Sequence, residues 1–348
     1  MKQRNTTIDL FRLVCAFFVV VIHCQLPIDH WLAAITRGAA LFPVISGYVI
    51  ADAGGEGLVK KRLNQQLRHL FFLLAGLGAL FLGINLVVSY CADGRGPGAV
   101  MGEFFQAQNF MRLLTFSATT LFYPVASGHL WYLMALLCAF ALLRLLLEYK
   151  PSRAWVRWLP AVGGAFSLVV FFTARAGGAQ MLYRNALLVL FYVMIGMWMR
   201  HNRERLERVP GWAVVALPVI FVALGLAERA LPVPGDWRAL IDIVLLRAPL
   251  CASMLLLCMR FPKAGEGSRA LRRLSRWGRE YSLGIYVIHN ILLRVVVNKL
   301  VQPYPRWLEP AGVPMAVYAY GLPAAVFLGA LAAAAGWSAI RRRVGARG

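Results

Sequence analysis

Charged residues are scarce in this chain, and acidic residues are the scarcest. Only 15% of the 348 residues are charged, and Asp and Glu number 15 against 37 Lys and Arg. Hydrophobic residues make up 60% of the chain, and its mean hydropathy is +0.64. A water-soluble globule of this size does not need so much apolar surface. The composition therefore excludes a soluble domain and predicts an all-α, polytopic membrane protein.

Several patterns typical of other protein classes are missing. The six cysteines form no CxxC pair, which excludes a disulfide framework, and we interpret them as apolar packing residues. There is no HxxxH or HExxH pair for zinc and no GxSxG turn for a serine hydrolase. The first apolar stretch contains Arg12 and no small-x-small cleavage site follows it, which argues against a cleaved signal peptide. We accordingly expect no metal ion.

Long hydrophobic runs predict ten transmembrane helices. They lie near residues 8–24, 33–51, 69–90, 129–147, 158–174, 186–199, 211–227, 240–259, 281–298 and 313–338. No polar stretch between them is long enough for a separate soluble domain, so we expect one domain over residues 1–348.

The net charge of +22 is concentrated on one side of these helices. Most Lys and Arg residues lie in the N-terminus and in alternate loops, at residues 2–4, 60–68, 150–157, 200–208, 260–279 and 341–347. This bias is the positive-inside signature and predicts that both termini are cytoplasmic. The basic loops thus indicate topology and contact with anionic membrane lipids, not nucleic acid as a partner. We expect the protein in a cell membrane, the bacterial cytoplasmic membrane.

Arg12 and His23 stand out within the first hydrophobic stretch. They are eleven positions apart, which is three helical turns plus about 20°, so both side chains leave one helix face about 16 Å apart. Such residues in a membrane helix are costly and mark a functional site by default. The alternative is that Arg12 extends to the membrane interface and His23 makes a hydrogen bond between helices.

The second hydrophobic run contains Phe42-Pro43-Val-Ile-Ser46-Gly47-Tyr48. Pro43 removes a backbone donor and Gly47 permits close approach, so we expect a kink or discontinuity there that opens on a cavity. The alternative is that Gly47 only lets two helices touch.

Two later runs also carry histidine beside aromatic residues. The fourth run begins with His129-Leu-Trp131-Tyr132; an interfacial aromatic belt explains the aromatic residues but explains the histidine less well. In the ninth run Tyr286, His289 and Asn290 are spaced to share one polar helix face. The basic segment 260–280 before it is either an amphipathic helix facing lipid or a cofactor site.

These residues favour acid–base chemistry by imidazole. A histidine in a dry cleft can accept a proton from an alcohol that attacks an activated acyl group. A cation such as Arg12 can neutralise a phosphate or polarise a carbonyl. The distance between Arg12 and His23 suits an extended donor that crosses part of the membrane.

The same motifs resemble the membrane acyltransferase-3 family of multi-span, acyl-CoA-dependent O-acyltransferases, over nearly the whole chain. Arg12 and His23 are similar to the family's Arg-x10-His signature, and Ser46-Gly47-Tyr48 to its Ser-Gly-Tyr motif. His129-Leu-Trp131 and the stretch ending in Tyr286-Val-Ile-His289 are similar to the later His-Leu-Trp and Tyr-x-x-His signatures.

The resemblance implies transfer of an acyl group, usually acetyl from acetyl-CoA, to a hydroxyl of a cell-surface carbohydrate or a lipid-linked sugar. It implies that His23 is the base and that Arg12 is its essential partner. Lys61, Arg62 and Arg68 stand, with a different spacing, where family members carry Arg-x-x-Arg, and would bind the donor. The implied substrate contacts are Ser46, Tyr48, His129, Trp131, Tyr286 and His289.

A second resemblance leaves an alternative function open. The stretches His23-Cys-Gln-Leu-Pro27 and His129-Leu-Trp-Tyr132 are similar to the membrane half of the vancomycin-resistance serine racemases. That similarity implies a membrane transport or binding module for a small amino acid such as serine, with no CoA site. Broken transmembrane helices would favour this alternative function. In the sequence, Pro43 and Pro249 are the residues that suggest such breaks.

Overall fold

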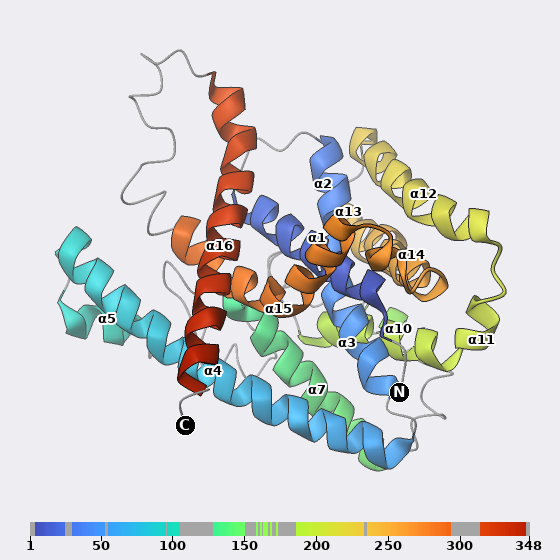
Figure 1. The fold of residues 1–348 in the computed structure, drawn as a ribbon, viewed down its shortest axis with the longest axis horizontal. Coiled ribbons are helices and arrows are strands. Elements are labelled where there is room, and N and C mark those ends of the chain that lie inside the picture. Colours follow the sequence, from blue (N-terminus) through green and yellow to red (C-terminus); the bar gives the residue numbers. More distant parts are fainter. Residues whose placement is uncertain are drawn as a thin grey trace. The chain divides into compact units, whose positions relative to one another are not determined.

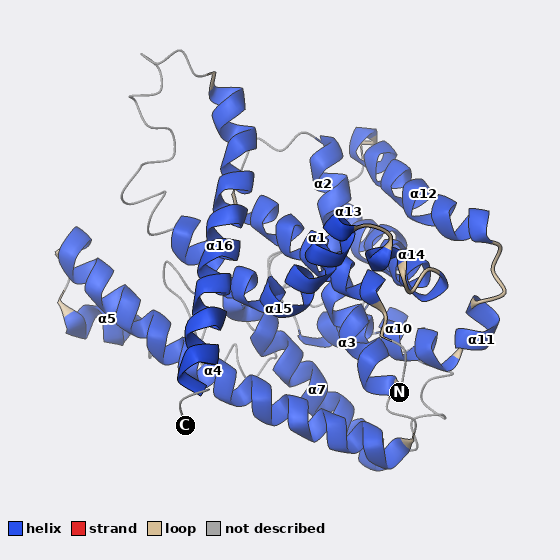
Figure 2. Cartoon of the chain, in the orientation of Figure 1, coloured by secondary structure: helices blue, strands red, loops and turns tan. Residues whose placement is uncertain are grey.

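The computed structural model describes residues 4–24, 30–52, 55–94, 96–104, 128–149, 186–232, 235–293 and 314–345, with a few positions between 158 and 172. Throughout these residues the chain forms helices joined by loops, and no strand occurs (Figure 2). The predicted all-α class is confirmed for this part of the chain.

The chain divides into two compact units, one made of residues 1–39 and 261–348 and the other of residues 40–260. The first unit holds α1 (Thr6–His23), α2 (His30–Thr36), η4 (Ala264–Glu266), α15 (Arg269–Ile291) and α16 (Met315–Gly345). In this unit α1 packs against α15 and α16, and α15 packs against α16 (Figure 1). The expectation of one domain over residues 1–348 stays a prediction.

The contact between α1 and α15 is unusually close because small residues lie in it. A methyl group added to Gly278 would fall 1.9 Å from the backbone oxygen of Asp9. Nearby, the Ser275 hydroxyl donates a 2.6 Å hydrogen bond to the backbone oxygen of Thr6, and the Thr6 amide donates to the backbone oxygen of Pro262. Two helices from opposite ends of the chain are thereby held in close contact, and the start of α1 is also bonded to the loop that precedes η4.

The second unit contains most of the remaining helices. They are α3 (Leu41–Ala51), α4 (Glu56–Asp93), α5 (Pro97–Phe104), η2 (Gly128–Leu130), α7 (Trp131–Tyr149), α10 (Ala186–His201), α11 (Arg203–Leu206), α12 (Gly211–Ala230), α13 (Gly235–Leu240), the π-helix η3 (Ile241–Arg247) and α14 (Ala248–Arg260). Within it α10 packs against α3 and α7, α4 lies along α7, and α12 packs against α14 (Figure 1).

The second hydrophobic run is interrupted, but not at the predicted place, because α3 continues without a break through Pro43, Ser46 and Gly47. A 3₁₀ turn, η1 (Arg37–Ala40), separates α2 from α3. Pro43 lies in the first turn of α3, where the missing N–H deprives the helix of no hydrogen bond. The helix therefore restarts at Leu41 instead of bending at the proline.

Gly47 lets α3 touch α10. A methyl group on Gly47 would lie 1.9 Å from the backbone oxygen of Val193, and one on Gly196 of α10 would lie 1.9 Å from the backbone oxygen of Val44. The two glycines thus face each other's helices reciprocally, as small residues do in membrane helix pairs. This confirms the packing interpretation of Gly47.

The described residues include seven helical stretches long and apolar enough to cross a membrane, so this is a multi-pass membrane protein. They are Thr6–His23, Ala34–Ala51, Gly57–Ile84, Trp131–Tyr149, Gly211–Ala230, Ile241–Arg260 and Tyr320–Arg343. A shorter apolar helix covers Ala186–His201. These stretches confirm seven of the ten predicted spans in position. The orientation, with both termini cytoplasmic, stays a prediction.

Two predicted spans cannot be compared fully with the structure. Most of the fifth, 158–174, lies outside the described residues. The ninth, 281–298, coincides with the second half of α15, which ends at Ile291; beyond Leu293 its residues lie outside the described part.

The prediction of a loop at residues 60–68 is wrong, because α4 runs without a break from Glu56 to Asp93. The segment contains no glycine or proline to stop a helix. Val59 and Leu63 are buried, four positions apart, and continue the buried side of the helix, on which Leu70 and Leu74 also lie. The basic residues of this segment are therefore helical, as are those from Arg269 onward in α15.

We expect Gly47→Ala to lower the stability of the protein by about 1–3 kcal/mol, because the added methyl group forces α3 and α10 apart. Thermal unfolding of the purified protein in detergent measures the change. Gly76→Ala on α4 is the matched control, because a methyl group there meets nothing within 4 Å. Equal melting temperatures for the two variants would contradict the close packing.

Candidate functional site

Arg12 lies beside an acidic partner on α1. Its Nη1 atom is 3.6 Å from Oδ1 of Asp9, three positions earlier, and the two side chains are 30% and 7% exposed. Arg4 donates a 2.8 Å hydrogen bond from Nε to Oδ2 of the same carboxylate. Asp9 therefore lies between two guanidinium groups. Its carboxylate holds the Arg12 side chain near the start of α1. Sequence reasoning missed this role of Asp9, although its i,i+3 spacing from Arg12 was the available signal.

His23, at the other end of α1, packs against His289 of α15. The centroids of the two imidazole rings are 5.1 Å apart, and the rings are inclined by 46°. His289 is fully buried, with 0% exposure, and its Nδ1 lies 3.1 Å from the backbone oxygen of Ile285. The structure thus joins two histidines that the sequence placed in separate spans.

Tyr286 and Asn290 complete this end of the first unit. The Tyr286 ring lies 6.0 Å from the His289 ring, and Tyr286, His289 and Asn290 are all buried. The predicted common face of these three residues on α15 is therefore confirmed, and it is buried in the protein.

The predicted donor-binding cations differ in their surroundings. Arg62 donates a 2.7 Å hydrogen bond from Nη1 to the backbone oxygen of Val49, in the last turn of α3. It therefore satisfies a carbonyl at the end of a helix, a structural role. Lys61 is exposed. Arg68 is exposed too, with its guanidinium 5.9 Å from the centroid of the Phe72 ring.

Ser46 and Tyr48 interact within their own part of the second unit. The Ser46 hydroxyl donates to the backbone oxygen of Phe42, one turn earlier in α3. The Tyr48 ring is buried, with the Arg200 guanidinium 5.9 Å from its centroid. Arg200 in turn pairs with Asp52. This group joins the end of α3 to the end of α10.

His129 and Trp131 stand where η2 passes into α7. His129 is buried, and its ring meets Phe81 of α4 edge to face with centroids 5.4 Å apart. Trp131 is half-buried and lies against Tyr132, with centroids 6.2 Å apart. These residues help to pack α7 against α4.

The sequence-predicted residues therefore fall into two sets. Arg12, His23, Tyr286 and His289 belong to the first unit, whereas Ser46, Tyr48, Lys61, Arg62, Arg68, His129 and Trp131 belong to the second. Within the first set the structure brings His23, Tyr286 and His289 together.

A charged pair also lies inside a candidate membrane span of the second unit. Asp242 and Arg247 pair within the π-helix η3, and the Tyr192 hydroxyl donates a 3.2 Å hydrogen bond to the backbone oxygen of Ile243. π-Helical turns and charged residues at membrane depth are both associated with functional sites.

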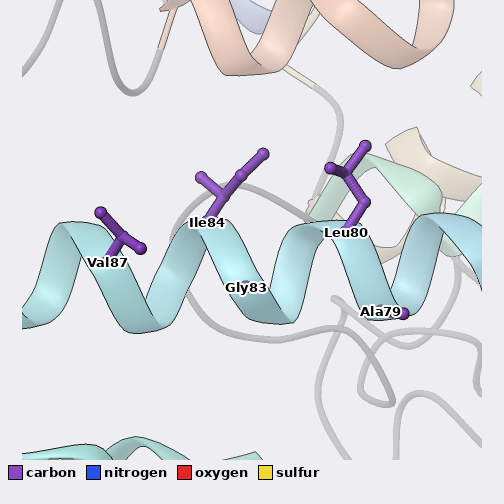
Figure 3. Close-up of a pocket in the computed structure, with 5 residues that line it drawn as sticks. All are labelled: Ala79, Leu80, Gly83, Ile84 and Val87. Atoms are coloured by element: carbon purple, nitrogen blue, oxygen red, sulfur yellow. The ribbon is translucent and has the colours of Figure 1, made fainter.

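A pocket of about 410 Å³ opens on the side of α4 (Figure 3). It is lined by Ala79, Leu80, Gly83, Ile84 and Val87. All five come from one helix and none carries an ionisable group, so this pocket cannot perform acid–base chemistry. Among the described residues, no group of three His, Cys, Asp or Glu side chains is placed to hold a metal ion.

The first unit offers an imidazole pair, formed by His23 of α1 and His289 of α15, and a guanidinium–carboxylate cluster at the start of α1. Imidazole can take up and return a proton, and a guanidinium stabilises an anion. The chemistry that this set can perform is therefore proton transfer near His23 on a substrate with an anionic portion.

Comparison with known proteins identifies one family. The profile of a family described as "Acyltransferase domain", acyltransferase-3, matches residues 5–340 of the chain. No curated protein and no solved structure matches it.

We expect Asp9→Asn to lower stability by about 1–3 kcal/mol, less than for a fully buried ion pair because Arg12 is 30% exposed. The amide keeps the size of the side chain but not the charge that holds Arg4 and Arg12. Thermal unfolding in nanodiscs measures the loss. Glu280→Gln is the control, since its partner Arg279 lies on an exposed helix face; an equal effect of both would refute the special role of Asp9.

Proposed function

Because the chain belongs to the acyltransferase-3 family of integral membrane acyltransferases, we propose that it moves an acetyl group from acetyl-CoA to a hydroxyl. The proposed acceptor is a cell-surface carbohydrate or a lipid-linked sugar. The observation that carries this proposal is the placement of His23 beside a second, buried histidine, on the same helix as the charged cluster of Arg12.

His23 is the proposed general base. Its imidazole takes the proton of the acceptor hydroxyl while the hydroxyl oxygen attacks the thioester carbonyl. The new carbon–oxygen bond forms, the carbon–sulfur bond breaks, and the imidazolium returns the proton to the departing thiolate. The products are the acetyl ester and free CoA.

Arg12 is the proposed anion-binding partner at the other end of α1. Its side chain is 30% exposed and lies beside Asp9, and a guanidinium held in this way can bind an anionic group through its planar fork. Three helical turns, about 16 Å, separate it from His23. An extended donor such as acetyl-CoA can reach both residues, because its phosphates and its thioester lie at opposite ends of a long arm.

We propose the remaining sequence-predicted contacts in two groups. Lys61 and Arg68 meet the phosphates of the donor, and their exposure supports this role. Arg62 donates a hydrogen bond to the backbone oxygen of Val49. Its proposed role in donor binding is therefore indirect, through the position of α3. Tyr286 contacts the acceptor beside His23, and Ser46, Tyr48, His129 and Trp131 are the further proposed substrate contacts.

The rival function is a binding or transport module for a small amino acid such as serine. One observation favours it: a 3₁₀ turn, η1, interrupts the helix before Pro43, and the helical turns before Pro249 are π-helical. Broken membrane helices expose backbone groups that bind small polar ligands in transporters. A ligand-binding measurement separates the two functions.

Acetyl-CoA should bind saturably to the purified protein in nanodiscs, and Arg12→Ala should weaken that binding by about tenfold or more, since a charge-assisted hydrogen bond is worth 1.5–3 kcal/mol. Isothermal calorimetry measures both affinities. The control is Arg229→Ala, a partly exposed arginine of α12 that pairs with Glu228. Failure to bind acetyl-CoA, together with a thermal shift on addition of L-serine, would favour the rival function.

Transfer of radiolabelled acetyl from acetyl-CoA to a membrane or glycan fraction should fall by about 10²–10⁴-fold in His23→Ala, the range for loss of a general base. Arg12→Lys should also impair transfer, because a point charge does not replace a planar fork. Donor binding by His23→Ala should persist, which shows that the variant is folded. Full turnover by His23→Ala would overturn the proposed mechanism.

A further inference from the structure

We propose that the first half of α15 is a binding surface for anionic phospholipids. The surface is an arginine row formed by Arg269, Arg272, Arg273 and Arg276, and its ligands are the phosphates of the lipid headgroups. The proposal concerns how the protein meets the membrane surface, and it does not depend on the proposed acetyl transfer.

The arginine row lies along one side of α15. Successive residues of an α-helix are turned by about 100°, so the four arginines fall within an arc of about 100°. All four are exposed. Ser275 and Gly278 are buried and lie more than about 100° from the middle of the row, on the side where Gly278 contacts α1. The row is therefore outside the helix interface and is accessible to a ligand.

Acidic side chains do not balance the charge of the row. Among the ion pairs of the described residues, none includes an arginine of the row, whereas the next arginine of the helix, Arg279, pairs with Glu280 at 2.9 Å. Arg272 donates one 2.9 Å hydrogen bond from Nη1 to the backbone oxygen of Glu266. A guanidinium has five N–H donors, so even Arg272 keeps donors for an anion.

The positions of these arginines are unfavourable for the helix unless an anion lies among them. They are three and four residues apart, the spacing at which side chains of a helix are neighbours and like charges destabilise it. Arg269 and Arg272 also stand in the first turn of α15, which has no acidic residue and where the helix dipole disfavours cations. Phosphates would remove this repulsion, because the planar guanidinium binds phosphate oxygens in pairs.

The same side of α15 becomes apolar where the predicted membrane span begins. Leu283 and Val287 follow Arg276 by seven and eleven positions and lie on the side of the row. Leu283 is 43% exposed and Val287 is half-buried, as expected for side chains that face lipid tails. The row therefore lies at the level of the headgroups. Basic clusters of this size beside a membrane helix are typical of proteins that bind anionic lipids.

A lipid surface fits the row better than a nucleotide cofactor does. Sites for cofactors are concave and cover most of the ligand, whereas the row lies on the exposed face of a single helix. A membrane presents many phosphates side by side and needs no pocket. We therefore favour the interpretation of segment 260–280 as an amphipathic helix that faces lipid.

The test measures the lipids that stay bound to the purified protein. The row variant is Arg269→Gln/Arg273→Gln/Arg276→Gln, which removes three charges and keeps good helix formers. Each protein in detergent is titrated with an equal mixture of phosphatidylglycerol and phosphatidylcholine, and native mass spectrometry counts the bound lipids. We expect the wild type to select phosphatidylglycerol and the row variant to bind it about 100-fold more weakly, about fivefold for each arginine. Equal binding of both lipids by the wild type would overturn the proposal.

A control variant separates the geometry of the row from total charge. Arg341→Gln/Arg342→Gln/Arg343→Gln removes three exposed arginines of α16, but these are consecutive and point in three directions around the helix. This variant should lose much less affinity for phosphatidylglycerol than the row variant. An equal loss in both would refute the row. Displacement of phosphatidylglycerol from the wild type by acetyl-CoA would instead indicate a cofactor site and would also refute the proposal.

Thermal unfolding in nanodiscs gives a second readout. In phosphatidylcholine alone the row variant should melt no lower than the wild type, because the substitutions remove repulsion between arginines. Phosphatidylglycerol should raise the melting temperature of the wild type, since a ligand of the folded state stabilises it, but not that of the row variant. Salt should reduce the increase by screening exposed charges. A row variant that is less stable than the wild type by the same amount in both membranes would show a purely structural role and contradict lipid binding.

Discussion

The close contact between α1 and α15 is the constraint on which the candidate site depends. Gly278 brings the α15 backbone against Asp9 of α1, and Ser275 ties the same region to Thr6 by a hydrogen bond. Because both helices are rigid, this contact near one end determines how closely side chains meet at the other, where His23 reaches His289. A single residue without a side chain thus influences a contact between side chains several turns away.

Much of this arrangement could be predicted from local patterns. Hydrophobic runs located seven spans, and helical spacing placed Arg12 and His23 on one face and grouped Tyr286 with His289. Those inferences need only the period of a helix, which is a property of neighbouring residues. The family relationship could also be inferred from motifs, because they are short and keep their order along the chain.

The contacts between distant segments could not be predicted in the same way. Nothing in a single sequence states that His23 lies against His289, or that Gly47 and Gly196 face each other's helices. The loop expected around Lys61 proved helical because charge, used there as a sign of topology, does not stop a helix. The pairing of Asp9 with Arg12 is different, because it is a contact between neighbours on one helix, and their spacing in the sequence could have predicted it.

The length of α4 has a mechanical consequence for the basic residues near its start. Its 38 residues extend for about 57 Å, whereas the hydrocarbon core of a bilayer is only about 30 Å thick. A helix of that length must tilt steeply in the membrane or project beyond it into the water as a rigid helix. Lys61 and Arg68 are two turns apart on nearly the same side of this helix, so they would then lie at a fixed height above the lipid. Arg62 is turned about 100° from Lys61 and reaches α3. Bending or shortening this helix would change how far these two cations are held from the membrane.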